Sequence, residues 1–270
     1  MIAHLVNTDV GSRGIGRLYL DYRTRNFHFL EDAAETFLNN LERTLIITGF
    51  PIPPSMTPET DGPPGALAVE KAVEKLGGRA EVLSYPEVME ALRPFGIPFA
   101  GYVDVSRYSL VVAVETPGRA VDGRYYSMSG MEITREAFDG LVIDARDYGI
   151  PTIAVGDGGN EAGMGNVRDL IEIYIPLGEK IASVVEADHL ITAGVSNWGA
   201  YGLVAQASII AGTNLLADWE EEMVVKALAG AELIDGVRKK PSESVDGIGL
   251  EVHREVVGLL KALVNDALGG

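Results

Sequence analysis

The chain has 270 residues, 47% of them hydrophobic, so it can bury a sizeable core within a single large α/β domain. Its formal net charge of −17 argues against a nucleic-acid or anionic-membrane partner, because either phosphate surface would repel it. It contains no cysteine, which excludes disulfides, thiolate metal sites and cysteine nucleophiles.

Apolar patterns predict helices and strands in alternation along the chain. Five continuous apolar runs indicate strands that are covered on both faces: 44–50, 80–85, 110–116, 152–157 and 189–194. Amphipathic or small-residue stretches indicate helices at 31–43, 64–78, 133–149, 199–212 and 248–268. The alternation predicts a Rossmann-like α/β fold of three layers, with a mostly parallel sheet flanked by helices. We expect one domain over residues 1–270, because no repeat, low-complexity tract or long linker interrupts the pattern.

The sequence also predicts where the protein resides. Its N-terminal residues lack the basic and apolar regions of a signal peptide. The longest apolar stretch, 201–219, is interrupted by polar residues and is too short to span a bilayer comfortably. We therefore expect a cytoplasmic protein.

Polar loops rich in glycine or proline follow four of the predicted strands, at 51–65, 116–130, 156–166 and 194–202. In doubly wound sheets, ligands bind outside the carboxyl ends of the strands. We therefore expect the four loops to converge on one cleft.

The loop GDGGNEAGMGN (156–166) combines five glycines with two carboxylates, Asp157 and Glu161. Its glycines lack the spacing of a dinucleotide fingerprint, and the lysine of a P-loop is missing. Exposed backbone N–H groups beside two acids fit a ligand with charges of both signs, such as an amino acid. Two alternatives stay open: a Mg²⁺ or Mn²⁺ ion held by both acids, and a tight turn in which Asp157 caps the next helix.

The loop 51–65 holds six of the thirteen prolines, which makes it stiff and, we predict, unable to form a strand. On this rigid frame it carries Thr57, Glu59 and Asp61, and Asp61 is placed to cap the helix that follows. A structural crossover is the alternative interpretation. Near the N-terminus, Arg13 is placed to reach an anion.

Two further loops carry candidate ligand-binding groups. Arg119 is a guanidinium fork for a substrate carboxylate, with Asp122 nearby and Tyr125 as a hydrogen-bond donor. Surface ion pairing is the alternative. Ser196 and Asn197 open a small-residue helix whose N-terminus favours an anion, and simple capping explains them equally well.

Three long blocks of sequence together resemble the D-glutamate cyclase family: 48–66 (TGFPIPPSMTPETDGPPGA), 118–130 (GRAVDGRYYSMSG) and 149–166 (GIPTIAVGDGGNEAGMGN). The resemblance covers residues 44–230. It implies a hydro-lyase that removes water from D-glutamate to give 5-oxo-D-proline. The amine attacks the γ-carboxyl carbon of the same molecule and closes a five-membered lactam.

That reaction assigns expected roles to the loops. We predict that Asp157 or Glu161 binds the substrate ammonium and takes its proton, and that Glu59 or Asp61 protonates the departing oxygen. Backbone N–H groups, or a metal ion on the same acids, would stabilise the tetrahedral oxyanion. The predicted substrate-binding residues are Thr57, Arg119, Asp122, Tyr125, Gly158, Gly159, Asn160, Ser196 and Asn197.

The expected partner is a small amino-acid substrate, with no nucleic acid and no membrane, and a homo-oligomer stays open. Mg²⁺ or Mn²⁺ is the only cofactor considered. Two other functions compete with the cyclase: a non-catalytic binder of a small acidic metabolite, and a metal-dependent hydrolase or phosphatase.

Overall fold

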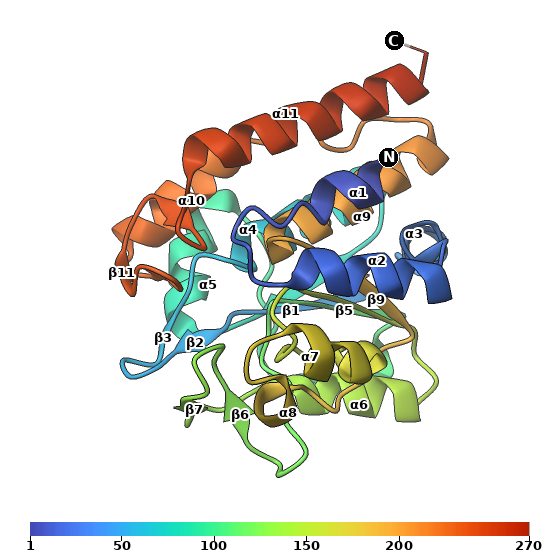
Figure 1. Cartoon of the computed structure of the whole chain (residues 1–270). Helices are drawn as coiled ribbons and strands as arrows, with labels where there is room; N and C mark the ends of the chain where they lie inside the picture. Colours follow the sequence, from blue (N-terminus) through green and yellow to red (C-terminus); the bar gives the residue numbers. More distant parts are fainter. Residues whose placement is uncertain (270) are drawn as a thin grey trace.

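Five parallel strands form the central sheet of the computed structural model, which describes residues 1–269. Their order across the sheet is β4-β1-β5-β8-β9 (Figure 1). The strands are β1 (Thr44–Thr48), β4 (Ala80–Leu83), β5 (Leu110–Val114), β8 (Thr152–Gly156) and β9 (His189–Thr192). Each lies in one of the five predicted apolar runs. Every residue of β1, β5 and β8 is buried, as expected for strands covered on both faces.

Helices cover both faces of this sheet, so the predicted three-layer α/β arrangement is confirmed (Figure 1). On one face α4 (Pro63–Lys75) and α9 (Ser196–Ala211) pack together, and α11 (Leu250–Ala267) lies outside them. On the other face α6 (Asp139–Asp147) packs against β5 and β8. The remaining α-helices are α1 (Ile2–Val6), α2 (Ile15–Arg25), α3 (Phe29–Asn39), α5 (Pro86–Leu92), α7 (Arg168–Tyr174), α8 (Gly178–Ile181) and α10 (Glu221–Gly230).

The strand order creates a crevice between β1 and β5. The chain leaves β1 towards β4 on one side and leaves β5 towards β8 on the other. The loops that follow these neighbouring strands therefore diverge, and such a reversal point is where doubly wound sheets bind ligands.

Two predictions about local structure were wrong. The proline-rich loop does form a short hairpin, β2 (Pro51–Ile52) with β3 (Thr57–Pro58). It can do so because the two prolines face each other, and Met56 N–H supplies a hydrogen bond to the Ile52 carbonyl. The helix expected from residue 133 begins only at Asp139, because β7 (Glu132–Ile133) pairs with β6 (Tyr125–Tyr126).

The segment before α11 forms two hairpins that the sequence did not predict. β10 (Ile234–Asp235) pairs with β11 (Lys240–Pro241), and β12 (Ser244–Val245) pairs with β13 (Ile248–Gly249). Asp235 joins them, because its carboxylate accepts hydrogen bonds from the Ser244 hydroxyl and the Gly247 N–H group. Among residues 1–269, no helix is long and apolar enough to cross a membrane.

Candidate active site

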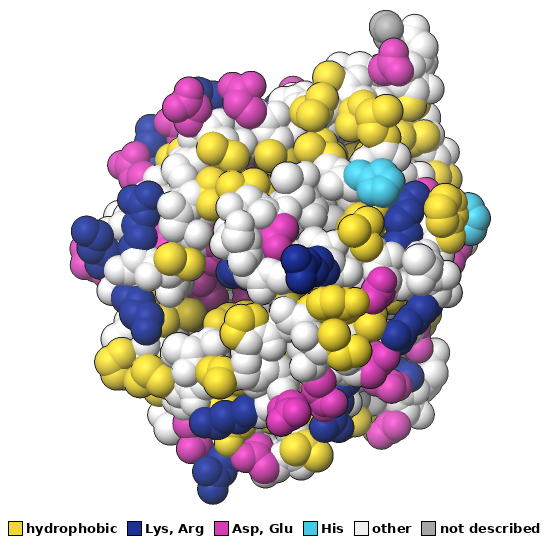
Figure 2. All heavy atoms as spheres, viewed as in Figure 1, with side chains coloured by type: hydrophobic (Ala, Val, Ile, Leu, Met, Phe, Trp, Pro, Cys, Tyr) yellow, Lys and Arg dark blue, Asp and Glu magenta, His cyan; other side chains and the backbone are white. Residues whose placement is uncertain are grey.

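A cavity of about 180 Å³ lies at the carboxyl ends of β1, β5 and β8, where the loops after these strands meet. The two C-terminal hairpins close one side of it. Figure 2 shows it as a recess left of centre, with acidic side chains at its bottom and basic side chains around it. The charged residues of its wall are Arg13, Glu59, Glu115, Asp157, Glu161, Lys239 and Asp246.

Asp61 lies beside this cavity, and hydrogen bonds of Asp61 and Asn197 connect the N-termini of α9 and α4. Its carboxylate accepts hydrogen bonds from the N–H groups of Ser196 and Asn197, both at 2.9 Å, at the start of α9. In return, the Asn197 side-chain oxygen accepts from Gly62 N–H at 3.0 Å and Gly65 N–H at 2.9 Å, at the start of α4. Asp61 therefore caps α9 across space, while at α4, where the sequence predicts the cap, it accepts a hydrogen bond only from the N–H group of Gly62, the residue before that helix. The α9 dipole favours its negative charge.

The glycine-rich loop wraps around its own carboxylate. Gly158 N–H and Gly159 N–H each donate to Glu161 at 2.7 Å. A Cβ on Gly158 would lie 2.6 Å from the Met128 sulfur, which explains one glycine of the run. The predicted oxyanion role of these two N–H groups does not fit, because Glu161 already occupies them. Asn160 does line the cavity, while its amide donates to the Tyr126 carbonyl.

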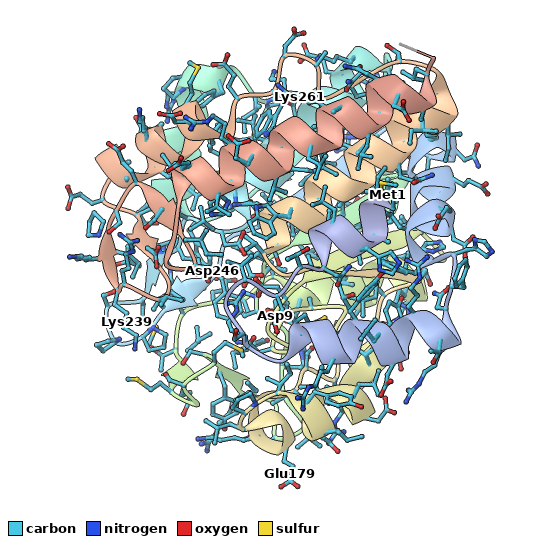
Figure 3. All side chains as sticks on the ribbon, turned by 45° about the horizontal axis from the view of Figure 1, so that its top comes forward. Met1, Asp9, Glu179, Lys239, Asp246 and Lys261 are labelled. Atoms are coloured by element: carbon cyan, nitrogen blue, oxygen red, sulfur yellow. The ribbon has the colours of Figure 1, made fainter. Side chains whose placement is uncertain are left out.

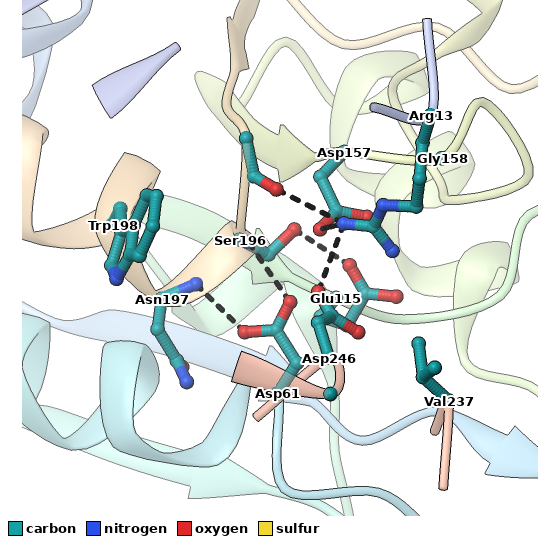
Figure 4. A network of polar contacts seen from close by, with 12 residues as sticks. Arg13, Asp61, Glu115, Asp157, Gly158, Ser196, Asn197, Trp198, Val237 and Asp246 are labelled. Atoms are coloured by element: carbon teal, nitrogen blue, oxygen red, sulfur yellow. Dashed lines mark hydrogen bonds and ion pairs between the residues drawn. The ribbon is translucent and has the colours of Figure 1, made fainter. Parts of the chain in front are cut away.

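Asp157 is paired with Arg13, which comes from the N-terminal segment. One terminal nitrogen of Arg13, Nη2, contacts Asp157 at 2.5 Å, Asp246 at 2.9 Å and the Gly194 carbonyl at 3.0 Å (Figure 4). Burial acts to lower the pKa of Arg13, but the surrounding carboxylates outweigh it and raise that pKa well above its usual value. The guanidinium therefore stays charged and offsets part of the negative charge in the cavity.

Glu115 completes the inner cluster immediately after β5. Its Oε2 accepts a hydrogen bond from the Ser196 hydroxyl at 2.6 Å, so Ser196 serves both Glu115 and Asp61. Its backbone φ of 46° lies in the left-handed region, which is costly for a side chain of this size. Local strain of this kind concentrates at functional sites.

Glu59 differs from the other acids, because its carboxylate has no hydrogen-bond partner within residues 1–269. The residue is only 6% exposed, and it lines the cavity. Its backbone is fixed by a bridge to Ile234 of the C-terminal hairpins. Thr57, two residues earlier, lies on the β2–β3 hairpin and is not part of the cavity wall.

Burial raises the pKa of five of these acids: Glu59, Asp61, Glu115, Asp157 and Glu161. The pKa of Asp61 rises to about 7, although the N–H groups at the start of α9 oppose the rise. Burial thus shifts the proton affinity of these carboxyls above that of exposed acids. They can therefore both accept and donate protons, as acid–base chemistry requires.

Of the nine predicted substrate-binding residues, only Asn160 is part of the cavity wall, and three of the others, Arg119, Asp122 and Tyr125, have their partners elsewhere in the protein. Arg119 makes a two-pronged contact with Asp139, at 2.7 and 3.1 Å, and the Tyr125 hydroxyl donates to the same carboxylate at 2.9 Å. Asp122 accepts a hydrogen bond from the Tyr126 hydroxyl. The Arg119 fork is therefore already filled by a protein carboxylate, so an ion pair within the protein explains this residue, although Asp139 is buried rather than at the surface.

Two overlapping groups of carboxylates have the spacing of metal ligands. Asp61, Asp157 and Asp246 form one group, and Glu115, Asp157 and Glu161 form the other. Within each group, one oxygen from every residue lies within 4.8 Å of the others. Such all-oxygen sets fit Mg²⁺ or Mn²⁺, so the donor chemistry is compatible with the cofactor considered from the sequence.

Gly236 gives a direct test of the packing around Glu59. A Cβ at this position would lie 1.9 Å from Glu59 Oε2. We expect Gly236→Ala to lower the free energy of unfolding by about 1–3 kcal/mol, measured by urea denaturation, because the hairpin or the carboxylate must move. The control is Gly258→Ala on α11, where a Cβ meets open space and should stabilise by up to about 1 kcal/mol. Equal stability of the two variants would contradict this packing.

Comparison with known proteins agrees with the resemblance seen in the sequence. The family model described as D-glutamate cyclase-like, C-terminal, matches residues 2–95 and 100–261. The human protein named D-glutamate cyclase, mitochondrial, is 35% identical over an alignment of 241 residues. That alignment covers 76% of this chain but only 38% of the human protein. The chain therefore belongs to the D-glutamate cyclase-like family.

Proposed function

We propose that the protein is a hydro-lyase that cyclises D-glutamate to 5-oxo-D-proline and water. One structural observation carries the proposal: buried carboxylates with raised pKa values surround one guanidinium in a small cavity at the reversal point of the sheet. Family membership supports it, because a relative bears the name of this activity.

The chemistry requires two proton movements. The substrate ammonium must lose two protons, one before nitrogen attacks the γ-carboxyl carbon and one as the lactam forms. The departing γ-oxygen must gain two protons to leave as water. The overall reaction therefore needs no external proton donor, only side chains that carry protons from nitrogen to oxygen. Holding the substrate in a folded conformation supplies a further part of the rate.

Free oxygen atoms distinguish between the two candidate bases. Both oxygens of Glu161 accept backbone N–H groups, whereas the hydrogen bond of Asp157 to Arg13 involves only Oδ2. Asp157 Oδ1 is thus available for the ammonium, and we assign Asp157 as the base. Glu161 contributes charge and holds the loop in place.

The two candidate acids also differ in their free oxygen atoms. Asp61 uses both oxygens for N–H groups at the start of α9 and of α4, so its carboxylate is committed to the fold. Glu59 has a raised pKa and no competing partner, so it can hold a proton facing the cavity. We assign Glu59 as the acid that protonates the departing oxygen. Glu115 also lines the cavity and has a raised pKa, and we assign it as a second proton carrier.

A divalent ion, if one is required, would be held by Asp157 together with one of two residue pairs: Asp61 and Asp246, or Glu115 and Glu161. When bound, Mg²⁺ or Mn²⁺ would act as a Lewis acid on the γ-carboxylate. The protein's own residues still have to hold the amine, fold the substrate and transfer the protons.

The test is incubation of the purified protein with D- or L-glutamate, with and without Mg²⁺ or Mn²⁺, followed by chiral chromatography of 5-oxoproline. We expect the D-enantiomer to give 5-oxo-D-proline. Tight binding of D-glutamate without product would favour the non-catalytic binder. Phosphate release from a phosphorylated metabolite, lost on chelation, would favour the hydrolase.

A further inference from the structure

Arg13 has donor groups that the fold leaves unused. Its contacts with Asp157, Asp246 and Gly194 all involve Nη2. The other two nitrogens, Nε and Nη1, carry three N–H groups for which residues 1–269 provide no acceptor. The side chain is 20% exposed, and it lines the cavity. Because the side chain lines the cavity and the fold supplies these donors with no partner, they are free to bind a ligand there.

The loop that carries Arg13 is held rigidly in place. Asp9, seen near the centre of Figure 3, accepts hydrogen bonds from Arg13 N–H at 2.9 Å and from Gly14 N–H at 3.0 Å. Gly14 has a φ of 100°, and a Cβ there would lie 2.5 Å from the Tyr174 carbonyl oxygen. The guanidinium is therefore positioned before any ligand arrives, which lowers the entropic cost of binding.

A carboxylate is the ligand that matches these donors. The planar guanidinium presents paired N–H groups that match the two oxygens of a carboxylate. The cavity wall otherwise holds five acids, which repel an anion. Lys239 is the other cation of the wall, but it is exposed at the mouth of the cavity.

We propose that Arg13 binds the α-carboxylate of the substrate; this assignment rests on the proposed cyclisation of D-glutamate. Asp157, which takes the ammonium, lies directly against Arg13. The ammonium and the α-carboxylate are attached to the same carbon, so a ligand with its nitrogen at Asp157 presents that carboxylate to the guanidinium. The γ-carboxyl group, two methylene groups further along, is left free to fold back onto the nitrogen.

This placement makes Arg13 a determinant of specificity. It selects ligands that carry a carboxylate on the carbon that bears the nitrogen. The product, 5-oxo-D-proline, retains only this carboxylate, whereas its carboxamide has no negative charge. Comparing these two ligands isolates the α-carboxylate contact from any contact with the γ-carboxyl group.

The experiment is isothermal titration calorimetry of 5-oxo-D-proline and 5-oxo-D-prolinamide with the wild type, Arg13→Gln and Arg17→Gln. Arg17 is an exposed arginine on the neighbouring α2, so its replacement causes the same change in net charge outside the cavity. We expect the wild type and Arg17→Gln to prefer the acid by about 10- to 100-fold, as for charged hydrogen bonds, and Arg13→Gln to lose this preference.

Two outcomes would overturn the assignment: a wild type that binds both ligands equally, or an Arg13→Gln variant that keeps the full preference. If Arg13→Gln does not fold, Arg13→Lys takes its place, and its preference should be reduced because the paired donors are lost. Turnover of D-glutamate by the wild type is measured on the same preparation. Absence of turnover counts against the proposed function, whereas turnover with an unchanged preference in the variant counts against Arg13 alone.

Discussion

Replacing Asp157 by asparagine is expected to lower kcat for formation of 5-oxoproline by about 10²–10⁴-fold, the usual contribution of a general base. The asparagine side chain keeps the shape of the aspartate but cannot take a proton from the substrate ammonium. Arg13 keeps its contacts with Asp246 and the Gly194 carbonyl, so the cavity should retain its form. Steady-state kinetics with D-glutamate, together with circular dichroism of the variant, measure both effects.

The matched control for this variant is Asp139→Asn. Asp139 is also a buried aspartate paired with an arginine, Arg119, but it lies outside the cavity wall. Its replacement should cost about 1–3 kcal/mol of stability, because hydrogen bonds from Arg119 and Tyr125 are weakened while the half-exposed Arg119 can still be hydrated, and kcat of the folded fraction should change little. If Asp157→Asn retained near-normal kcat, or if both variants lost it equally, the assignment of Asp157 as the base would be wrong.

Replacing Glu59 by glutamine is expected to change how stability depends on pH. The pKa of Glu59 is raised well above its ordinary value, because the residue is buried and faces Asp246 and Asp61. The folded protein therefore binds more protons here than the unfolded chain does. The resulting stabilisation is complete below the ordinary pKa of a glutamate and is lost as pH rises through the raised value. Glutamine cannot ionise, so this loss disappears in the variant.

Urea denaturation at pH 5 and pH 8 measures this effect. The wild type should be less stable at pH 8, and Glu59→Gln should raise its free energy of unfolding there by about 1–3 kcal/mol, the cost of a buried polar group without a partner. The gain should shrink at pH 5, where the wild-type carboxyl is protonated. The same variant should lose turnover, because Glu59 is the proposed acid. A variant that is destabilised at pH 8, or that keeps the pH dependence of the wild type, would contradict the environment described for Glu59.

The general position of the site could be predicted from the sequence, because it follows from the direction of the strands. Continuous apolar runs indicated parallel strands, and the carboxyl ends of parallel strands lie at one edge of the sheet. The loops carrying Glu59 and Asp157 therefore had to meet. The hydrogen bonds of individual groups could not be predicted. The glycine N–H groups near Asp157 bind the side chain of Glu161 rather than an anionic ligand.

Residues from outside these loops were harder to find. The sequence predicts an anion contact for Arg13, but no periodic pattern shows that the N-terminal segment lies over the sheet. Asp246 lies in a tight turn between two-residue strands, which leave almost no pattern in the sequence. Glu115 could have been identified from the sequence. Its carboxylate directly follows a buried apolar strand and therefore lies at the edge of the sheet where ligands bind. Arg119 was misplaced because the sequence does not show that Asp139 fills its guanidinium fork.

In the proposed reaction, this cavity joins the nitrogen of D-glutamate to its own γ-carboxyl carbon. Carbon-13 NMR of D-glutamate labelled at the γ-carboxyl carbon follows that atom directly during incubation with the wild-type protein. We predict that the carboxylate resonance is replaced by a lactam carbonyl resonance in the presence of the wild type and persists with Asp157→Asn. A carboxylate resonance that persists in the presence of folded wild-type protein, with and without Mg²⁺ or Mn²⁺, would contradict the proposal.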